Sequence, residues 1–288
     1  MTGVAYDGYE LLTAEREAGV VTVTVASPPM NLMGSALLDE IDRVVAEVDS
    51  DPAALVLVLQ SSVPGFFLCH ASYRDLGRMK APTLPESIDE TPLNAVQQIG
   101  MRLVGMDTVS IAKVQGRATG GGAALALACD LRYGEIGSAV FNSFGVPMAT
   151  GLGGGATQHL PRIIGRSRAM EVILGGLDLD AATADSWGYL TRAFESTDID
   201  AAVTAIARRI AQSEPAIVRG TKELIAGAVG APTDLGLREE NFRLQRANAT
   251  DAARQAIEDF LALGGETVDG ESRLEQLLGE VLDRRAAS

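Results

Sequence analysis

The segment VQGRATGGGAALALACD, residues 114–130, decides the fold class of this 288-residue chain. Three glycines, 120–122, open a run of small apolar residues that ends at Cys129 and Asp130. Glycine costs backbone entropy, so a triplet between a strand and a helix indicates close approach of another group and open main-chain N–H donors near the helix start. We therefore expect a site that binds negative charge with backbone amides. The alternative is that the glycines only let a helix and a sheet pack closely.

The sequence on either side of this segment alternates between strand and helix patterns. The run ALVLVLQ at 54–60 is continuously apolar, which is typical of a strand buried on both faces. Apolar spacing of about 3.6 residues indicates helices, and alternation of apolar and polar residues indicates strands. We expect strands at 19–26, 54–60, 109–115, 131–133 and 139–142, and helices at 36–48, 93–106, 121–129, 199–212, 216–227 and 235–262. This order predicts a β/α core, residues 1–200, followed by a helical region, residues 201–288.

Composition and charge narrow the class of protein. Hydrophobic residues make up 47% of the chain, which is enough to bury a substantial core. Acidic residues outnumber basic ones by 38 to 24, giving a formal net charge of −14, and no cluster of lysines and arginines interrupts this acidity. A nucleic-acid partner is therefore not expected.

The first ten residues, MTGVAYDGYE, have neither the basic start nor the apolar stretch of a secretory signal. No apolar run reaches the ~18 residues that a membrane span needs, so we expect a cytoplasmic protein without a membrane span. The chain has two cysteines and two histidines. The two cysteines stand far apart in dissimilar contexts, and two imidazoles are few for a metal centre, so neither a disulfide framework nor a metal site is predicted.

Four segments carry a family pattern by their joint order. They are SPPMNLM (27–33), PGFFLCHASYRDL (64–76), IAKVQGRATGGGAALALACDLRY (111–133) and FNSFGVPMATGLGGGATQHLPRIIGRSRAMEVILGG (141–176), the last followed by DAATADSWGYLTRAF (180–194). In this order they resemble the crotonase (enoyl-CoA hydratase/isomerase) superfamily over residues 20–261. The resemblance implies an α/β fold, the crotonase (ClpP-like) spiral of ββα units with a C-terminal helical trimerisation region. It also implies a homotrimer, or a hexamer that is a dimer of trimers.

The resemblance further implies that the chain binds an acyl-CoA thioester, with coenzyme A present as part of the substrate and no tightly bound cofactor. Two backbone N–H groups would hold the thioester carbonyl oxygen while an enolate forms, as an oxyanion hole. In this sequence the expected donors are the amides of Cys69 and Gly121. The assignment of Gly121 as a donor also has a physical basis, because amides in the first turn of a helix are unpaired and the helix dipole favours an anion there.

The chain departs from the family at the positions that supply acids and bases. Hydratases of the family use two glutamates, and here those positions hold Ala124 and Gly145. Related isomerases and dehalogenases place an aspartate slightly later, where this chain has Gly153. Hydration of an enoyl thioester needs an acid and a base in position, so standard hydration is not expected.

The loop that the family writes F-x-A-G-x-D-L is altered too, because His70 stands at the glycine and Ser72 at the aspartate. Imidazole is the side chain best suited to acid–base chemistry at neutral pH, so His70 is a candidate acid or base, against the alternative of a structural histidine. Tyr73 is a candidate proton donor, against the alternative that it packs beneath the acyl chain. The remaining substrate-binding residues are expected to be Ala71, Ser72, Gly120, Ala124, Ser143, Gly145, Thr150 and Gly153. Candidates for contacts with the phosphates of coenzyme A are Arg74, Lys80, Arg117, Lys222 and Arg243.

Three functions remain open. The first is a crotonase-type lyase or isomerase that forms a thioester enolate and carries out isomerisation, decarboxylation or C–C bond chemistry. The second is an enoyl-CoA hydratase with atypical residues, which predicts water addition to crotonyl-CoA. The third is a catalytically silent acyl-CoA-binding paralogue or subunit, which predicts thioester binding without turnover. We favour the first, because the usual carboxylates are missing.

Overall fold

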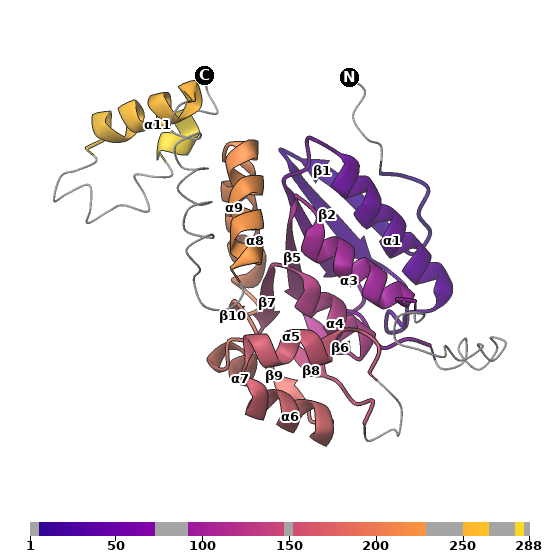
Figure 1. Ribbon diagram of the computed structural model, residues 1–288. Helices are drawn as coiled ribbons and strands as arrows, with labels where there is room; N and C mark the ends of the chain where they lie inside the picture. The colour runs from indigo at the N-terminus through magenta and orange to yellow at the C-terminus, as the bar shows by residue number, and fades with distance from the viewer. Residues whose placement is uncertain (1–5, 73–91, 147–151, 229–249, 265–279, 285–288) are drawn as a thin grey trace. The chain divides into compact units, whose positions relative to one another are not determined.

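A computed structural model of the chain describes residues 6–72, 92–146, 152–228, 250–264 and 280–284 (Figure 1). The chain divides into two compact units, residues 1–204 and 205–288. The second unit includes α9 (Pro215–Gly227) and α11 (Asp251–Ala262). Among the described residues, no helix is both long and apolar enough to cross a membrane. Assembly into a trimer or hexamer stays a prediction.

The first unit is built on a six-stranded sheet. Its strands, in spatial order, are β1 (Leu12–Glu17), β2 (Val20–Val25), β3 (Val56–Ser61), β5 (Val109–Val114), β7 (Leu131–Glu135) and β10 (Arg192–Phe194). β1 is antiparallel to β2, and all other neighbours are parallel. The expected alternation holds in β2, where Val21, Val23 and Val25 are fully buried and the threonines between them are not.

The first unit also contains a second, smaller sheet, whose strands alternate along the sequence with those of the large sheet. It contains β4 (Gly65–Phe66), β6 (Gly116–Thr119), β8 (Val140–Asn142) and β9 (Leu179–Asp180), in that order. β4, β6 and β8 are parallel, and β9 is antiparallel to β8. The sequence patterns predicted β8 alone of these four strands and assigned no element to residues 116–120.

The two sheets give the chain a repeating path. β3, β4 and α3 (Ala95–Gly105) follow one another, then β5, β6 and α4 (Gly121–Ala128), then β7, β8 and α5 (Ala156–Ile163). Each repeat contributes one strand to the large sheet and one to the small sheet, parallel to the strand of the previous repeat. The expected spiral of ββα units is therefore confirmed.

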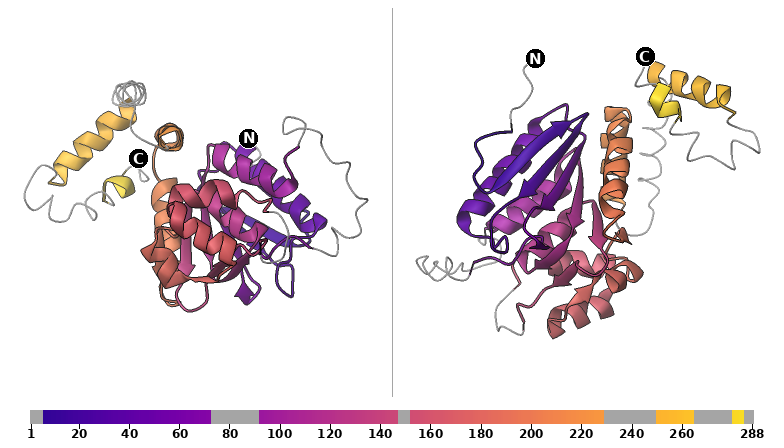
Figure 2. Two further views of the ribbon diagram at one scale, coloured as in Figure 1. Left: turned by 60° about the horizontal axis from the view of Figure 1, so that its bottom comes forward. Right: turned by 180° about the vertical axis from the view of Figure 1, so that it is seen from behind.

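Helices cover one face of the large sheet. α1 (Ser35–Ser50) and α3 lie side by side on that face in the views of Figures 1 and 2. α4 packs against α3, and its residues from Gly122 to Ala128 are all buried. The remaining helices of the described chain are α6 (Arg166–Gly175), α7 (Ala181–Ser186) and α8 (Ile199–Ala211). The glycine triplet thus stands at the entrance to a helix in the core of the first unit.

Candidate active site

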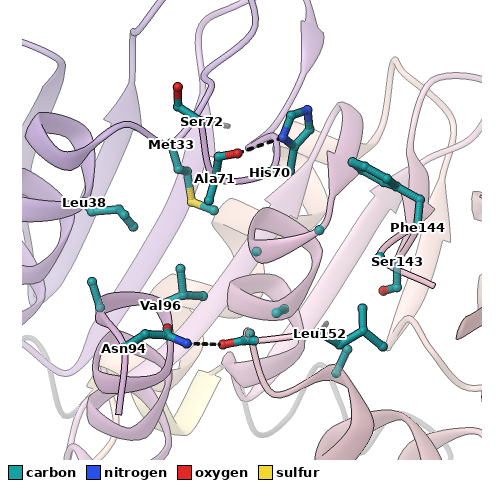
Figure 3. Close-up of a pocket in the computed structure, with 18 of the residues that line it drawn as sticks. Met33, Leu38, His70, Ala71, Ser72, Asn94, Val96, Ser143, Phe144 and Leu152 are labelled. Carbon is teal, nitrogen blue, oxygen red and sulfur yellow. Dashed lines mark hydrogen bonds between the residues drawn. The ribbon is translucent and has the colours of Figure 1, made fainter. Parts of the chain in front are cut away.

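A pocket of about 650 Å³ lies in the first unit (Figure 3). Four helices begin at its lining. The first residues of α1, α3, α4 and α5 all line it: Ser35, Ala95, Gly121 and Ala156. The N-terminal end of a helix carries unpaired N–H groups and partial positive charge. The pocket therefore has the electrostatics for a group that gains negative charge.

The glycine triplet is packed too closely for side chains. A Cβ at Gly120 would lie 2.7 Å from the Cβ of His70, and one at Gly122 would lie 2.0 Å from the carbonyl oxygen of Leu68. The glycines therefore allow the close packing that the sequence suggested as an alternative, and they also leave a backbone N–H without an acceptor among the described residues. Gly121 is the first residue of α4 and lines the pocket, and in the part of the chain that the structure describes no acceptor binds its amide.

Cys69 does not present its amide to the pocket, and the expectation for it is wrong. Its N–H donates to the carbonyl oxygen of Asn31 at 3.0 Å, so the donor is already used. Burial raises the pKa of the Cys69 thiol, although a hydrogen bond with Thr119 and the charge of Arg117 act in the opposite direction. A buried thiol of raised pKa is a poor nucleophile as well.

Ala71 supplies the open amide instead. Met33 donates to the carbonyl oxygen of His70 at 3.2 Å, and Ser72 donates to the carbonyl oxygen of Met33 at 2.9 Å. In a trans peptide the C=O and the next N–H point in opposite directions. Because the His70 carbonyl points at Met33, the Ala71 N–H points away from Met33, and no acceptor binds it among the described residues. Ala71 lines the pocket.

His70 is held at the edge of the same pocket (Figure 3). Its Nδ1 lies 2.9 Å from the carbonyl oxygen of Ala71, and its ring stands edge-on to Phe144 with centroids 5.1 Å apart. A carbonyl oxygen only accepts, so Nδ1 carries the proton and Nε2 is the basic nitrogen of the neutral ring. The imidazole is thus oriented by its neighbours.

The positions that lack carboxylates also meet in this pocket. Ala124 and Gly145 are both buried and both line it. Gly153 also lines the pocket, and its carbonyl oxygen accepts a hydrogen bond from Asn94 Nδ2 at 2.7 Å (Figure 3). The expected substrate-binding residues that the structure brings together are Ala71, Ser72, Gly120, Ala124, Ser143, Gly145 and Gly153. Tyr73 and Thr150 lie outside the described residues, as do Arg74, Lys80 and Arg243.

Few charged groups reach the pocket from the described chain. The ionisable side chains that line it there are Asp39 and His70. Arg117, a candidate for a phosphate contact, donates from both terminal nitrogens of its guanidinium to Asp178, at 2.9 and 2.7 Å. Within the described residues no group of His, Cys, Asp and Glu side chains is arranged to hold a metal ion.

The apolar lining was not predicted from the sequence. Met33, Leu38, Val96, Phe144 and Leu152 form much of the wall. Periodicity identifies such residues as apolar but does not separate those that face a neighbour from those that face a cavity. The segments of the resemblance at 27–33 and 141–176 include three of them, Met33, Phe144 and Leu152.

Comparison with known proteins identifies the family. A family model described as enoyl-CoA hydratase/isomerase matches residues 15–262. The chain belongs to the enoyl-CoA hydratase/isomerase family. The superfamily resemblance and the crotonase fold are therefore confirmed.

Individual members of the enoyl-CoA hydratase/isomerase family match most of the chain. It is 28% identical over 254 residues to the protein named "Probable enoyl-CoA hydratase echA8" of Mycobacterium tuberculosis, covering 88% of this chain and 95% of that protein. It is 27% identical over 248 residues to the short-chain-enoyl-CoA hydratase of Clostridium acetobutylicum, covering 86% and 93%. The crystal structure of an enoyl-CoA hydratase from Bacillus anthracis matches 88% of this chain and 96% of that one, with a TM-score of 0.79 and 24% identity.

Proposed function

We propose that this protein binds an acyl-CoA thioester and stabilises its enolate with the amides of Ala71 and Gly121. The observation that carries the proposal is that both N–H groups are open and both residues line one pocket. Donors built into the backbone need no reorganisation when charge develops on the carbonyl oxygen. Each such donor typically contributes ~2.7 to 4 kcal/mol to the transition state, and the dipole of α4 adds to that of Gly121.

The reaction we propose is enolate chemistry other than standard hydration: isomerisation, decarboxylation or C–C bond cleavage or formation. Water addition needs one group to activate water and another to protonate the α-carbon. Ala124 and Gly145 offer neither, although both face the pocket. The family relatives named above are called hydratases, but the residues of this chain favour a different use of the same enolate.

His70 is the side chain that we propose as acid or base. Its Nδ1 proton is held by the Ala71 carbonyl, which leaves Nε2 as the nitrogen that takes or gives a proton. The same residue that carries the proposed donor amide therefore also orients the imidazole. Asp39 is the other ionisable group of the described lining, and it is exposed at the start of α1.

The lining supports a largely hydrocarbon acyl group. Met33, Leu38, Val96 and Leu152 give walls that exclude water from a chain of CH₂ groups. Burial of each CH₂ stabilises binding by about 0.8 kcal/mol. A pocket of about 650 Å³ leaves room for an acyl chain beside the thioester.

The test is a panel of coenzyme A thioesters with acyl groups of different length and charge. Binding is measured by calorimetry, α-proton exchange by NMR in D₂O, and products by mass spectrometry. We expect binding of several thioesters, α-proton exchange, and products other than the β-hydroxy thioester. Fast hydration of crotonyl-CoA would contradict the proposed reaction, and binding without exchange or turnover would favour the silent paralogue. Failure to bind any thioester would contradict the proposed function altogether.

A further inference from the structure

We propose that Thr119 is a positioning residue that sets the separation of the two open amides, those of Ala71 and Gly121. The proposal rests on the proposed function, because it concerns the same pair of donors. It goes beyond that function in assigning a role to a side chain that does not itself line the pocket.

The two donor segments are joined by a short ladder of hydrogen bonds. Phe67 donates to the carbonyl oxygen of Arg117 at 2.9 Å, and Thr119 donates to the carbonyl oxygen of Leu68 at 3.0 Å. The next bond is made by a side chain: the His70 N–H donates to Thr119 Oγ1 at 3.2 Å. The two open amides lie immediately beyond it, one residue after His70 and two after Thr119.

Thr119 is buried at the end of β6. Its own N–H donates to the Leu68 carbonyl oxygen, and its hydroxyl oxygen accepts from the His70 N–H. Thr119 thus holds Leu68 and His70, on either side of Cys69, shortly before the proposed donor Ala71.

The opposite side of His70 is fixed as well. Its carbonyl oxygen accepts from Met33, and this bond directs the Ala71 N–H. His70 is therefore held through its N–H by the strand that leads into α4 and through its C=O by the segment before α1. Of these two anchors, only the hydroxyl of Thr119 ties Ala71 to the segment that carries Gly121.

Loss of the hydroxyl has a defined consequence. The His70 N–H would be left without its Thr119 acceptor next to the open Ala71 N–H, and leaving a partly buried donor unsatisfied costs free energy. The segment relieves this by turning or shifting, which moves the Ala71 amide relative to Gly121. A misplacement of about 1 Å can lower a reaction rate by about 100-fold without removing any substrate contact.

The experiment compares Thr119→Val, which keeps the shape and loses the hydroxyl, with Thr119→Ser, which keeps the hydroxyl. Crotonyl-CoA labelled with ¹³C at the carbonyl is bound to each protein, and the carbonyl stretch is measured by infrared difference spectroscopy. Thermal unfolding and the dissociation constant are recorded alongside. If Thr119→Val folds poorly, Thr119→Ala, which adds no apolar group, is measured in the same way.

We expect the wild type and Thr119→Ser to lower the carbonyl frequency equally, and the variants without the hydroxyl to lose much of this shift while still binding. Where the thioester panel identifies a turnover, kcat should fall about 10- to 100-fold in those variants with KM unchanged. An equal shift in wild type and in the variants without the hydroxyl would overturn the role of Thr119 alone. A bound thioester whose frequency does not change in the wild type would instead overturn the proposed pair of donors.

Discussion

Replacing Gly122 with alanine tests whether the glycine triplet packs as described. A Cβ at this position would lie 2.0 Å from the carbonyl oxygen of Leu68, 2.4 Å from its carbonyl carbon and 2.7 Å from its Cβ. Two of these atoms are backbone, and the oxygen accepts from the Thr119 N–H. The clash cannot be relieved by turning a side chain, so the two donor segments must move apart.

The magnitude follows from the distances. Ordinary van der Waals contact begins at 3.4 Å, so the segments must separate by at least about 1.4 Å. Overpacking of this kind costs about 1–3 kcal/mol, and loss of the bond between Thr119 and Leu68 costs about 1 kcal/mol more. At about 2–4 °C per kcal/mol, the melting temperature should fall by about 5 to 15 °C.

The assay is thermal and urea unfolding of Gly122→Ala beside the matched control Gly105→Ala. Gly105 ends α3, has an ordinary φ, and a Cβ there would meet nothing within 4 Å. The control should keep its melting temperature or gain slightly, because alanine is the better helix former. Equal melting temperatures for Gly122→Ala and the wild type would refute the packing of residues 120–122 against the segment before His70.

Three further predictions concern the pocket and its supports. In a folded Ala124→Glu/Gly145→Glu double variant, water addition to crotonyl-CoA should appear or rise, since an acid and a base then face the pocket; loss of enoyl absorbance measures it. Asp178→Asn should lower stability by at most about 1 kcal/mol at pH 7, because Arg117 pairs with a carboxylate that is half exposed. Hydrogen bonds from Arg117 hold the pKa of Asp178 below its usual value. The ionised carboxylate therefore stabilises the fold above about pH 4, and this stabilisation is lost on further acidification. Urea unfolding midpoints of both proteins at pH 7 and pH 3 measure it. Asn94→Ala should cost about 1 kcal/mol by uncapping α3, whereas Asn94→Asp keeps the cap and should stay near the wild type in urea unfolding.

Each of these has a result that would contradict it. A folded double variant that adds no water would mean that His70 or its loop has reshaped the pocket. A difference between Asp178→Asn and the wild type that is as large at pH 3 as at pH 7 would mean that the carboxylate charge is not its source. Equal losses in Asn94→Ala and Asn94→Asp would show that the bond to the glycine-rich loop, rather than the cap, provides the stability.

Much of the fold follows from local patterns, and the exceptions have physical causes. β1 was missed because its residues, LTAERE, are charged and largely exposed, as suits an edge strand. The turn between β1 and β2 is made by Ala18 and Gly19, both of which have positive φ in the structure. β6 was missed because GRAT has no strand pattern of its own. Its close approach to β4, where a Cβ at Gly116 would lie 2.3 Å from Gly65, is a tertiary contact.

The site was predicted in part. Gly121 could be identified from the sequence because a helix start after a glycine turn is a local feature. The second open amide was assigned to Cys69 instead of Ala71, since the direction of each peptide there is set by Asn31 and Met33, far away in the chain. No pattern in the loop itself reports those bonds.

A crystal structure with a coenzyme A thioester bound would show directly whether the two amides hold the carbonyl oxygen. We expect this oxygen to lie about 2.7–3.1 Å from both the Ala71 and the Gly121 nitrogens. A carbonyl oxygen that contacts neither nitrogen, or an acyl chain seated outside the pocket beside His70, would contradict this expectation.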